Sequence, residues 1–332
     1  MTEHPFAPFV RILGKGPHLS RPLTLGEARR AAGMILDGEV EPVQLGAFLC
    51  LLRVKTETPE EVAGFAMAIR DHLHPPADMP PVDIDWPSYA GKSRQLPLFL
   101  LSALLLAENG LTIVMHGASG HTAGRLYADE ALAALGLAPA RTLEEAARTL
   151  AARNFAFVPM ELLHPRLPEI LGLKPLLGLR SPLHTVVRNL NPFNARLSLM
   201  SVFHPTYRPV HCAASRLMGM TALACFKGEG GEIERRPEKP CQVEGIVNGD
   251  TFSEDWPAAF DGVPPRDCPM DPLRLAALWR GDWRDAHAEA TVIATAAIAL
   301  RHIGRAATPA GALSLAGSLW TDRRRDLLPA AV

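Results

Sequence analysis

Four prolines, Pro75, Pro76, Pro80 and Pro81, fall within one short segment of this chain. Each proline fixes its own φ angle, lacks an amide hydrogen and disfavours helix in the preceding residue. No helix continues through such a segment, so we expect it to link two differently built domains. A length of 332 residues is consistent with two domains, since one domain commonly holds about 150 residues.

The sequence before this linker predicts helices with clear ends. Thr24 precedes Glu27 by three residues, which is the spacing of a capping box at a helix start. Gly38 then ends the first helix, Pro42 begins a second, and Thr58 begins a third. We therefore expect residues 1–80 to form an all-helical domain.

Beyond the linker, short β-like runs alternate with helical segments. Such alternation predicts an α/β domain over 81–332 with a mainly parallel sheet. The expected strands are 111–115, 155–158, 197–203 and 221–226, and the expected helices are 98–108, 127–135, 143–152 and 286–303.

Composition excludes several classes of protein. Lys and Arg number 34 against 35 acidic residues, so net charge predicts no general attraction to nucleic acid or membrane. The longest apolar run, 96–107, is shorter than the roughly 20 residues that cross a bilayer, and the N-terminus lacks the pattern of a secretory signal. We expect a cytoplasmic protein without membrane contact.

The dispersed cysteines predict neither disulfides nor a zinc site, and His116 with His121 lacks further metal ligands at suitable spacing.

Several segments of the first domain closely resemble the N-terminal domain of anthranilate phosphoribosyltransferases, members of glycosyl transferase family 3. The matching segments are 25–28, 38–40, 42–48 and 53–64, and weaker similarity continues over about 300 residues. The resemblance implies a nucleoside phosphorylase/phosphoribosyltransferase-like fold. It also implies a small helical dimerisation domain, with helices from about 164–190 packed on it, and a substrate cleft at the hinge to the α/β domain.

The resemblance fails at the family's pyrophosphate-binding loop. That loop is a GTGGD sequence whose free amides hold the anion, because only glycine permits such close backbone approach. Here the segment 85–92 replaces it, with Pro87 lacking an amide hydrogen and bulky aromatic residues on either side. The residues of this degenerate loop are Ser88, Tyr89, Ala90, Gly91 and Lys92.

Three further parts of the family's site are altered. The KHGN stretch corresponds to 115–118, which keeps His116 but loses the cation and the amide. The magnesium-binding Asp-Glu pair corresponds best to Gly231–Glu232, and one carboxylate is a poor cage for Mg²⁺. The arginine that holds the anthranilate carboxylate falls at or near Lys174, which cannot make the same two-pronged contact.

The segments 88–97, 180–185 and 227–232 are most similar to the YbiB-type branch of this family. That resemblance implies a homodimer that binds nucleic acid and has no known transferase activity.

The charge pattern supports the same hypothesis independently. Residues 162–227 include eight basic residues and one acid, Glu169, whereas acids are concentrated in 244–271. If the fold gathers the cations on one face, contacts to phosphates follow. The alternative is that they are scattered on solvated faces or pair with the acidic segment. The family resemblance implies a position near the hinge cleft for Lys92, Arg94, Lys174, Arg180 and Arg188. Together with Arg196 and Arg208 they are the candidate nucleic-acid-binding residues.

Aromatic residues beside these cations could stack on bases, but core packing is the favoured interpretation for Trp86, Tyr89 and Tyr207.

The favoured hypothesis is a homodimer that binds single-stranded or duplex nucleic acid without strong sequence specificity, and that needs no cofactor or metal. The alternative is a glycosyltransferase or phosphoribosyltransferase acting on an acceptor other than anthranilate. That enzyme would use Mg²⁺ together with His116, His184 and Glu232.

Overall fold

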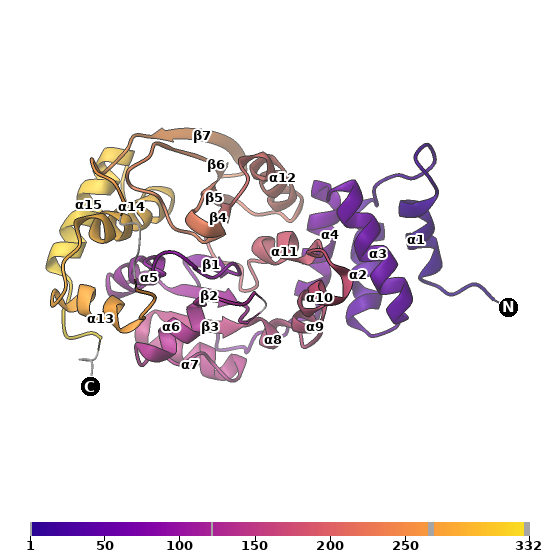
Figure 1. The fold of residues 1–332 in the computed structure, drawn as a ribbon, viewed down its shortest axis with the longest axis horizontal. Helices are drawn as coiled ribbons and strands as arrows, with labels where there is room; N and C mark the ends of the chain where they lie inside the picture. Colours follow the sequence, from indigo (N-terminus) through magenta and orange to yellow (C-terminus); the bar gives the residue numbers. More distant parts are fainter. Residues whose placement is uncertain (1, 121, 265–268, 329–332) are drawn as a thin grey trace. The chain divides into compact units, whose positions relative to one another are not determined.

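Residues 2–120, 122–264 and 269–328 are described by a computed structural model, in which the chain divides into two units (Figure 1). The first unit comprises Met1–His74, Met160–Pro192 and Pro209–Met220. The second comprises Pro75–Pro159, Phe193–Arg208 and Thr221–Val332. In the described part of the chain, no helix is long and apolar enough to cross a membrane.

The first unit is helical, as the sequence predicts. Its helices are α1 (Ala7–Gly14), α2 (Leu25–Leu36), α3 (Pro42–Lys55), α4 (Pro59–His72), α8 (Met160–Leu163), α9 (Arg166–Gly172), α10 (Lys174–Leu177), α11 (Leu183–Val186), the 3-10 helix η1 (Val187–Asn189) and most of α12 (Arg208–Leu217). The capping box of Thr24 and Glu27 is present, and Thr58 caps α4 in the same way. Local polar signals therefore place these helix starts correctly.

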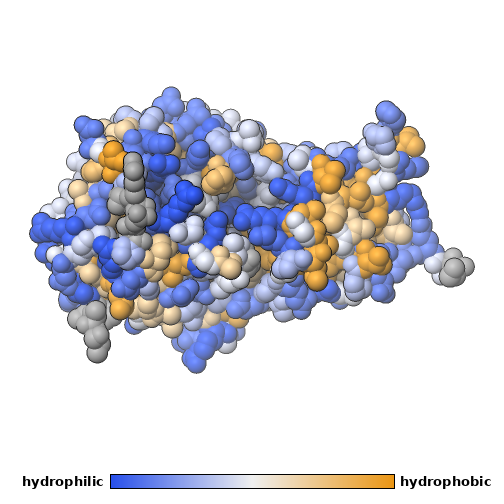
Figure 2. Space-filling model, in the orientation of Figure 1, coloured by the Kyte–Doolittle hydropathy of each residue, from blue (hydrophilic) through white to orange (hydrophobic). Residues whose placement is uncertain are grey.

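Helix α3 is apolar on two faces. Its inner face buries Phe48, Leu49 and Leu52 within the unit, whereas Val43 and Val54 are 80% and 79% exposed. Figure 2 shows apolar side chains gathered at the surface over the helices of this unit. Such an exposed apolar face is characteristic of a surface that contacts another protein.

The second unit is built on a seven-stranded sheet in the order β3-β2-β1-β4-β5-β6-β7. Strands β1 to β5 all run parallel to one another, β6 pairs antiparallel with both β5 and β7, and β7 lies at the edge of the sheet. The expectation of a mainly parallel sheet is confirmed. The strands are β1 (Ile84–Ser88), β2 (Ile113–Gly117), β3 (Phe155–Pro159), β4 (Leu197–Val202), β5 (Ala222–Lys227), β6 (Cys241–Val247) and β7 (Asp250–Trp256).

Helices of the second unit bury the apolar sheet. Phe99 to Ala107 of α5 are buried on every side, in one core with Trp86 of β1 and Val292 of α14. The remaining elements are α5 (Phe99–Glu108), α6 (Ala128–Ala134), α7 (Leu143–Arg153), η2 (Pro205–Tyr207), η3 (Glu229–Gly231), α13 (Leu273–Arg280), α14 (Ala286–His302) and α15 (Pro309–Asp322).

Strand β1 is not among the strands predicted from the sequence. Pro87 lies within this strand although it cannot donate to a sheet ladder. The pairing explains its presence: β1 pairs with β2 over its whole length but with β4 only at Ile84 and Asp85. The ladder to β4 has therefore ended before Pro87, where a missing amide hydrogen costs little.

Candidate functional site

Strands β1 and β2 end in register at Ser88 and Gly117, at one edge of the sheet. Open α/β sheets bind ligands outside the carboxyl ends of their parallel strands. A Cβ atom at Gly117 would lie 2.2 Å from the Ser88 carbonyl oxygen, so the two strand ends approach too closely for any other residue. The loop 88–92 begins at this position, where the sequence predicts a degenerate form of the family's pyrophosphate-binding loop.

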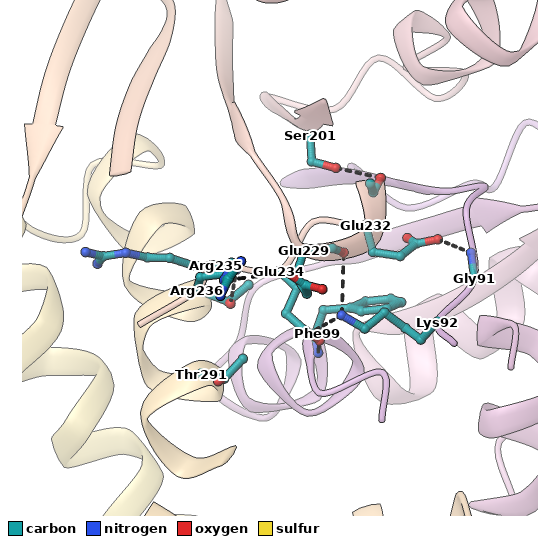
Figure 3. A network of polar contacts seen from close by, with 12 residues as sticks. Gly91, Lys92, Phe99, Ser201, Glu229, Glu232, Glu234, Arg235, Arg236 and Thr291 are labelled. Atoms are coloured by element: carbon teal, nitrogen blue, oxygen red, sulfur yellow. Dashed lines mark hydrogen bonds and ion pairs between the residues drawn. The ribbon is translucent and has the colours of Figure 1, made fainter. Parts of the chain in front are cut away.

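A carboxylate of the same chain occupies the amides of this loop. The Ala90 and Gly91 backbone nitrogens donate hydrogen bonds of 2.6 and 2.7 Å to Oε1 of Glu232 (Figure 3). The Glu232 side chain is fully buried, and its Oε2 has no hydrogen-bond partner in the described part of the chain. The two amides therefore already bind an anionic group supplied by the protein.

The other side of the loop is fixed by Arg125. Its guanidinium donates to the Ala90 and Gly91 carbonyl oxygens at 2.8 and 3.1 Å. Gly91 has φ +65°, and a Cβ there would lie 3.1 Å from atoms of Arg125 and Tyr127. Both the conformation and the space favour glycine at this position. Amides and carbonyls of the loop are thus held within the protein.

Lys92, a candidate phosphate contact from the sequence, lies in a buried ion pair. Its Nζ is 2.6 Å from Oε1 of Glu234, and the two side chains are 2% and 0% exposed. The second oxygen of Glu234 accepts a 2.9 Å hydrogen bond from the Phe99 amide at the start of α5 (Figure 3). Burial raises the pKa of Glu234, and the neighbouring Lys92 opposes that rise. In this structure Lys92 is therefore unavailable to a phosphate backbone.

Beneath the loop lies a buried polar cluster centred on His116. The Tyr89 hydroxyl and Nδ1 of His116 are 2.6 Å apart, and Nε2 of His116 is 3.1 Å from Oδ1 of Asp85. Ser198 donates a 2.8 Å hydrogen bond to the other Asp85 oxygen. All four side chains are buried, so the cluster holds β1, β2 and β4 together and has no surface at which to meet a substrate.

Taken together, the charges and polar groups of the loop are compensated inside the protein. An incoming pyrophosphate would have to displace the Glu232 carboxylate from the two amides. It would also find the nearest ammonium, that of Lys92, neutralised by Glu234. The arrangement stabilises one closed loop conformation and offers no preformed anion site.

The carboxylates also fit magnesium poorly. One oxygen of Glu232 accepts two amides, and both oxygens of Glu234 have donors. Mg²⁺ needs near-octahedral oxygen ligands and usually takes free carboxylates together with waters or phosphates. Among the residues that the structure describes, no group of three or more His, Cys, Asp or Glu side chains is placed to hold a metal ion.

Three other candidate cations belong to the second unit. Arg94 is exposed and has no ion pair within the described ranges. Arg196 pairs with Asp83 at 2.8 Å, and Arg208 pairs with Glu244 at 3.1 Å. Arg208 thus follows the alternative weighed from the sequence, in which the cations pair with the acidic segment.

The remaining three candidates belong to the first unit. Arg180 is exposed, and Lys174 and Arg188 are half-buried. Neither Arg180 nor Lys174 forms an ion pair with a described acidic residue, and no acid occurs between Glu169 and Glu229 in the sequence. These two side chains are therefore free to meet an external anion.

His184 belongs to a different unit from the other residues proposed for catalysis. It belongs to α11 of the first unit, where its Nδ1 lies 3.1 Å from the Ser181 carbonyl oxygen, whereas His116 and Glu232 belong to the second unit. Neither unit by itself brings the three residues together.

The aromatic residues near the cations differ in exposure. Trp86 and Tyr89 are buried, and Tyr207 is half-buried, in agreement with core packing for the first two. Phe203, in contrast, is 59% exposed directly after β4. Phe203 ends the apolar run 197–203, which predicts a strand, so nothing in the sequence marks it as a surface residue.

Glu234 and Arg125 are not among the site residues predicted from the sequence. Glu234 follows Glu232 by two residues, which places both carboxylates on one side of an extended segment. That spacing is the available signal, but it does not reveal that the partners lie about 140 residues earlier.

Comparison with known proteins adds independent evidence. Residues 8–73 match the helical bundle domain of the glycosyl transferase family. The chain is 31% identical over 239 residues to uncharacterized protein YbiB of Escherichia coli, and the aligned region covers 70% of this chain and 74% of that protein. It is 30% identical over 257 residues to anthranilate phosphoribosyltransferase of Gluconobacter oxydans, and that aligned region covers 74% of this chain and 69% of the relative.

Solved structures show the same fold. Anthranilate phosphoribosyltransferase from Thermus thermophilus superposes with a TM-score of 0.79 at 20% identity, over 96% of this chain and 94% of that one. The Saccharomyces cerevisiae enzyme in complex with PRPP and Mg gives a TM-score of 0.75 at 16% identity, over the same shares of the two chains. At these identities the likeness is one of fold.

Proposed function

This chain belongs to the anthranilate phosphoribosyltransferase-like family of glycosyl transferases, and we propose that its function within that family is to bind nucleic acid. The binding is directed at the phosphate backbone, shows little preference for sequence, and accepts single strands or duplex. The protein acts as a homodimer and needs no cofactor.

The observation that supports this proposal most is the free cations of an acid-free segment. Between Glu169 and Glu229 the sequence contains no acid, and Lys174 and Arg180 have no ion pair in the described part of the chain. When such cations neutralise phosphates, the counterions condensed on the nucleic acid are released, which gives affinity without base readout. Dimerisation would present each cation twice.

The closed loop supports the same function by arguing against transfer of a phosphoribosyl group. Glu232 occupies the amides that such chemistry would use, and Glu234 neutralises Lys92. Catalysis of this kind depends on preorganised donors aimed at developing charge. Here those donors are already engaged.

A titration with oligonucleotides at several salt concentrations tests the proposal. We expect log affinity to fall linearly with log salt, at a slope of about 0.9 per phosphate contacted on duplex and about 0.7 on single strands. R180A and K174A should each weaken binding about fivefold at 0.1 M salt and make the slope shallower by about 0.7 on single strands. Unrelated sequences should lose affinity by similar factors.

The matched control is R305A, which removes an exposed arginine outside the basic segment and should leave both affinity and slope unchanged. Affinity independent of salt would contradict the proposal. So would a failure of the unmodified protein to bind any oligonucleotide near physiological ionic strength.

The second candidate is a phosphoribosyltransferase acting on an acceptor other than anthranilate; the 30% identity to an anthranilate phosphoribosyltransferase favours transferase chemistry, and the altered site favours a different acceptor. An assay of pyrophosphate release from phosphoribosyl pyrophosphate with Mg²⁺ separates the two functions. We expect no turnover with anthranilate and none with other aromatic amines, because the loop amides are occupied. Measurable turnover with another aromatic amine would establish the second candidate instead, and turnover with anthranilate would contradict both candidates.

A further inference from the structure

Phe203 is an exposed aromatic residue at the edge of the sheet where ligands of such folds bind. It follows Val202, the last residue of β4, and 59% of it is accessible to solvent. Among the large hydrophobic residues that are exposed in the described ranges, it alone is aromatic. Exposure of more than half of a phenylalanine is unfavourable in water and is typical of a residue that contacts a ligand or partner.

The neighbouring residue extends this aromatic surface. His204 is also exposed, and its ring lies edge-on to Phe203, with centroids 4.8 Å apart and planes at 82°. Pro205 then begins the 3-10 helix η2, in which the Tyr207 amide donates to the His204 carbonyl. A short proline-initiated turn thus fixes the backbone directly behind the two rings.

The same edge also presents a free cation. Lys227 ends β5 in register with Val202, and Gly228 donates a 3.2 Å hydrogen bond to the Val202 carbonyl. Lys227 is exposed and forms no ion pair with any acid that the structure describes. The nearest acid in the sequence, Glu229, lies 3.6 Å from Arg236.

We propose that Phe203 stacks on an unpaired base of single-stranded nucleic acid, with Lys227 meeting an adjacent phosphate. This inference rests on the proposed function and adds a preference to it, because the faces of bases are accessible in single strands and covered in a duplex. Stacking on an aromatic side chain favours every base, so the site adds affinity for single strands without sequence readout.

The test compares F203A with the unmodified protein on a homothymidine strand and on a duplex of equal length. F203A should weaken single-strand binding by about 5-fold to about 100-fold, which corresponds to the stacking of one base. It should leave duplex affinity unchanged. The salt slope should also stay the same, since no charge is removed. K227A should weaken single-strand binding and make its slope shallower by about 0.7.

Two further variants make the result specific. F203W should retain single-strand affinity, and the fluorescence of the added tryptophan should be quenched when the strand binds. L273A removes a different exposed apolar side chain, on α13, and should change nothing.

The outcomes separate the two proposals. If the protein binds oligonucleotides but F203A binds single strands as tightly as before, stacking is refuted and the proposed function stands. Equal losses on single strands and duplex would also refute stacking. If the unmodified protein binds no oligonucleotide, both proposals fail.

Discussion

Replacing Lys92 with methionine tests whether this side chain has a structural role. The Lys92–Glu234 pair is fully buried at 2.6 Å, so the variant leaves a buried carboxylate without its cation. Removing one partner of a buried ion pair costs about 3–5 kcal/mol, because the remaining charge loses its compensation. Glu234 retains the Phe99 amide as a donor, which offsets little of that cost.

The double variant K92M/E234Q should recover most of the loss. A neutral glutamine still accepts from the Phe99 amide, and methionine fills the space of the lysine stem without a charge. In a double-mutant cycle the two single losses of about 3–5 kcal/mol each should therefore far exceed the loss in the double variant, which corresponds to a coupling of more than about 4 kcal/mol. E234Q alone leaves the ammonium of Lys92 buried and unpaired and should be as damaging as K92M.

Urea unfolding followed by tryptophan fluorescence measures these changes in the relevant unit. All five tryptophans lie in the second unit, so the signal reports on its unfolding alone. With a urea dependence of about 2–3 kcal/mol per molar, K92M should lower the midpoint by about 1–2 M. In conditions where K92M is folded, its affinity for oligonucleotides should equal that of the unmodified protein.

The opposite result would refute this reasoning. A K92M protein that unfolds at the same urea concentration but binds nucleic acid weakly would make Lys92 a phosphate contact at the surface. The assignment of Lys92 to a buried ion pair with Glu234 would then be wrong.

Two other predictions concern assembly and pH. Because the apolar face of α3 is exposed, V43E and V54E should convert the proposed dimer into a monomer without loss of helix. Light scattering measures the oligomeric state, and circular dichroism measures the helix content. An unmodified protein that is monomeric at micromolar concentration would refute the dimer. Burial lowers the pKa of His211 to about 3 and that of His302 to about 4, so below pH 6.5 the unfolded chain binds protons that the folded chain does not. The free energy of unfolding should therefore fall by about 2 kcal/mol per histidine between pH 7 and pH 5. H302F should lose about half of that pH dependence. An equal fall in H302F and in the unmodified protein would show that His302 is not the cause.

The sequence by itself determined the features that depend on neighbouring residues. Thr24 and Glu27 are three residues apart and satisfy each other's backbone donors, so the start of α2 is fixed locally. The proline segment and the alternation of strands and helices likewise indicate a helical part followed by a mainly parallel sheet. The family resemblance rests on the same local segments, and the comparisons confirm it.

The tertiary structure alone decided the state of the candidate site. A sequence shows that Lys92 is basic and that Glu232 is acidic, but not whether either charge meets solvent. Glu232 and Glu234 lie about 140 residues after the loop in the chain, and their contacts engage two loop amides and the charge of Lys92, which the sequence predicts to bind nucleic acid. Conversely, Phe203 belongs to an apolar run in the sequence and reaches solvent only because β4 ends at Val202. The reason is physical: helix capping involves atoms a few residues apart, whereas burial and charge compensation depend on which distant segments the folded chain brings into contact.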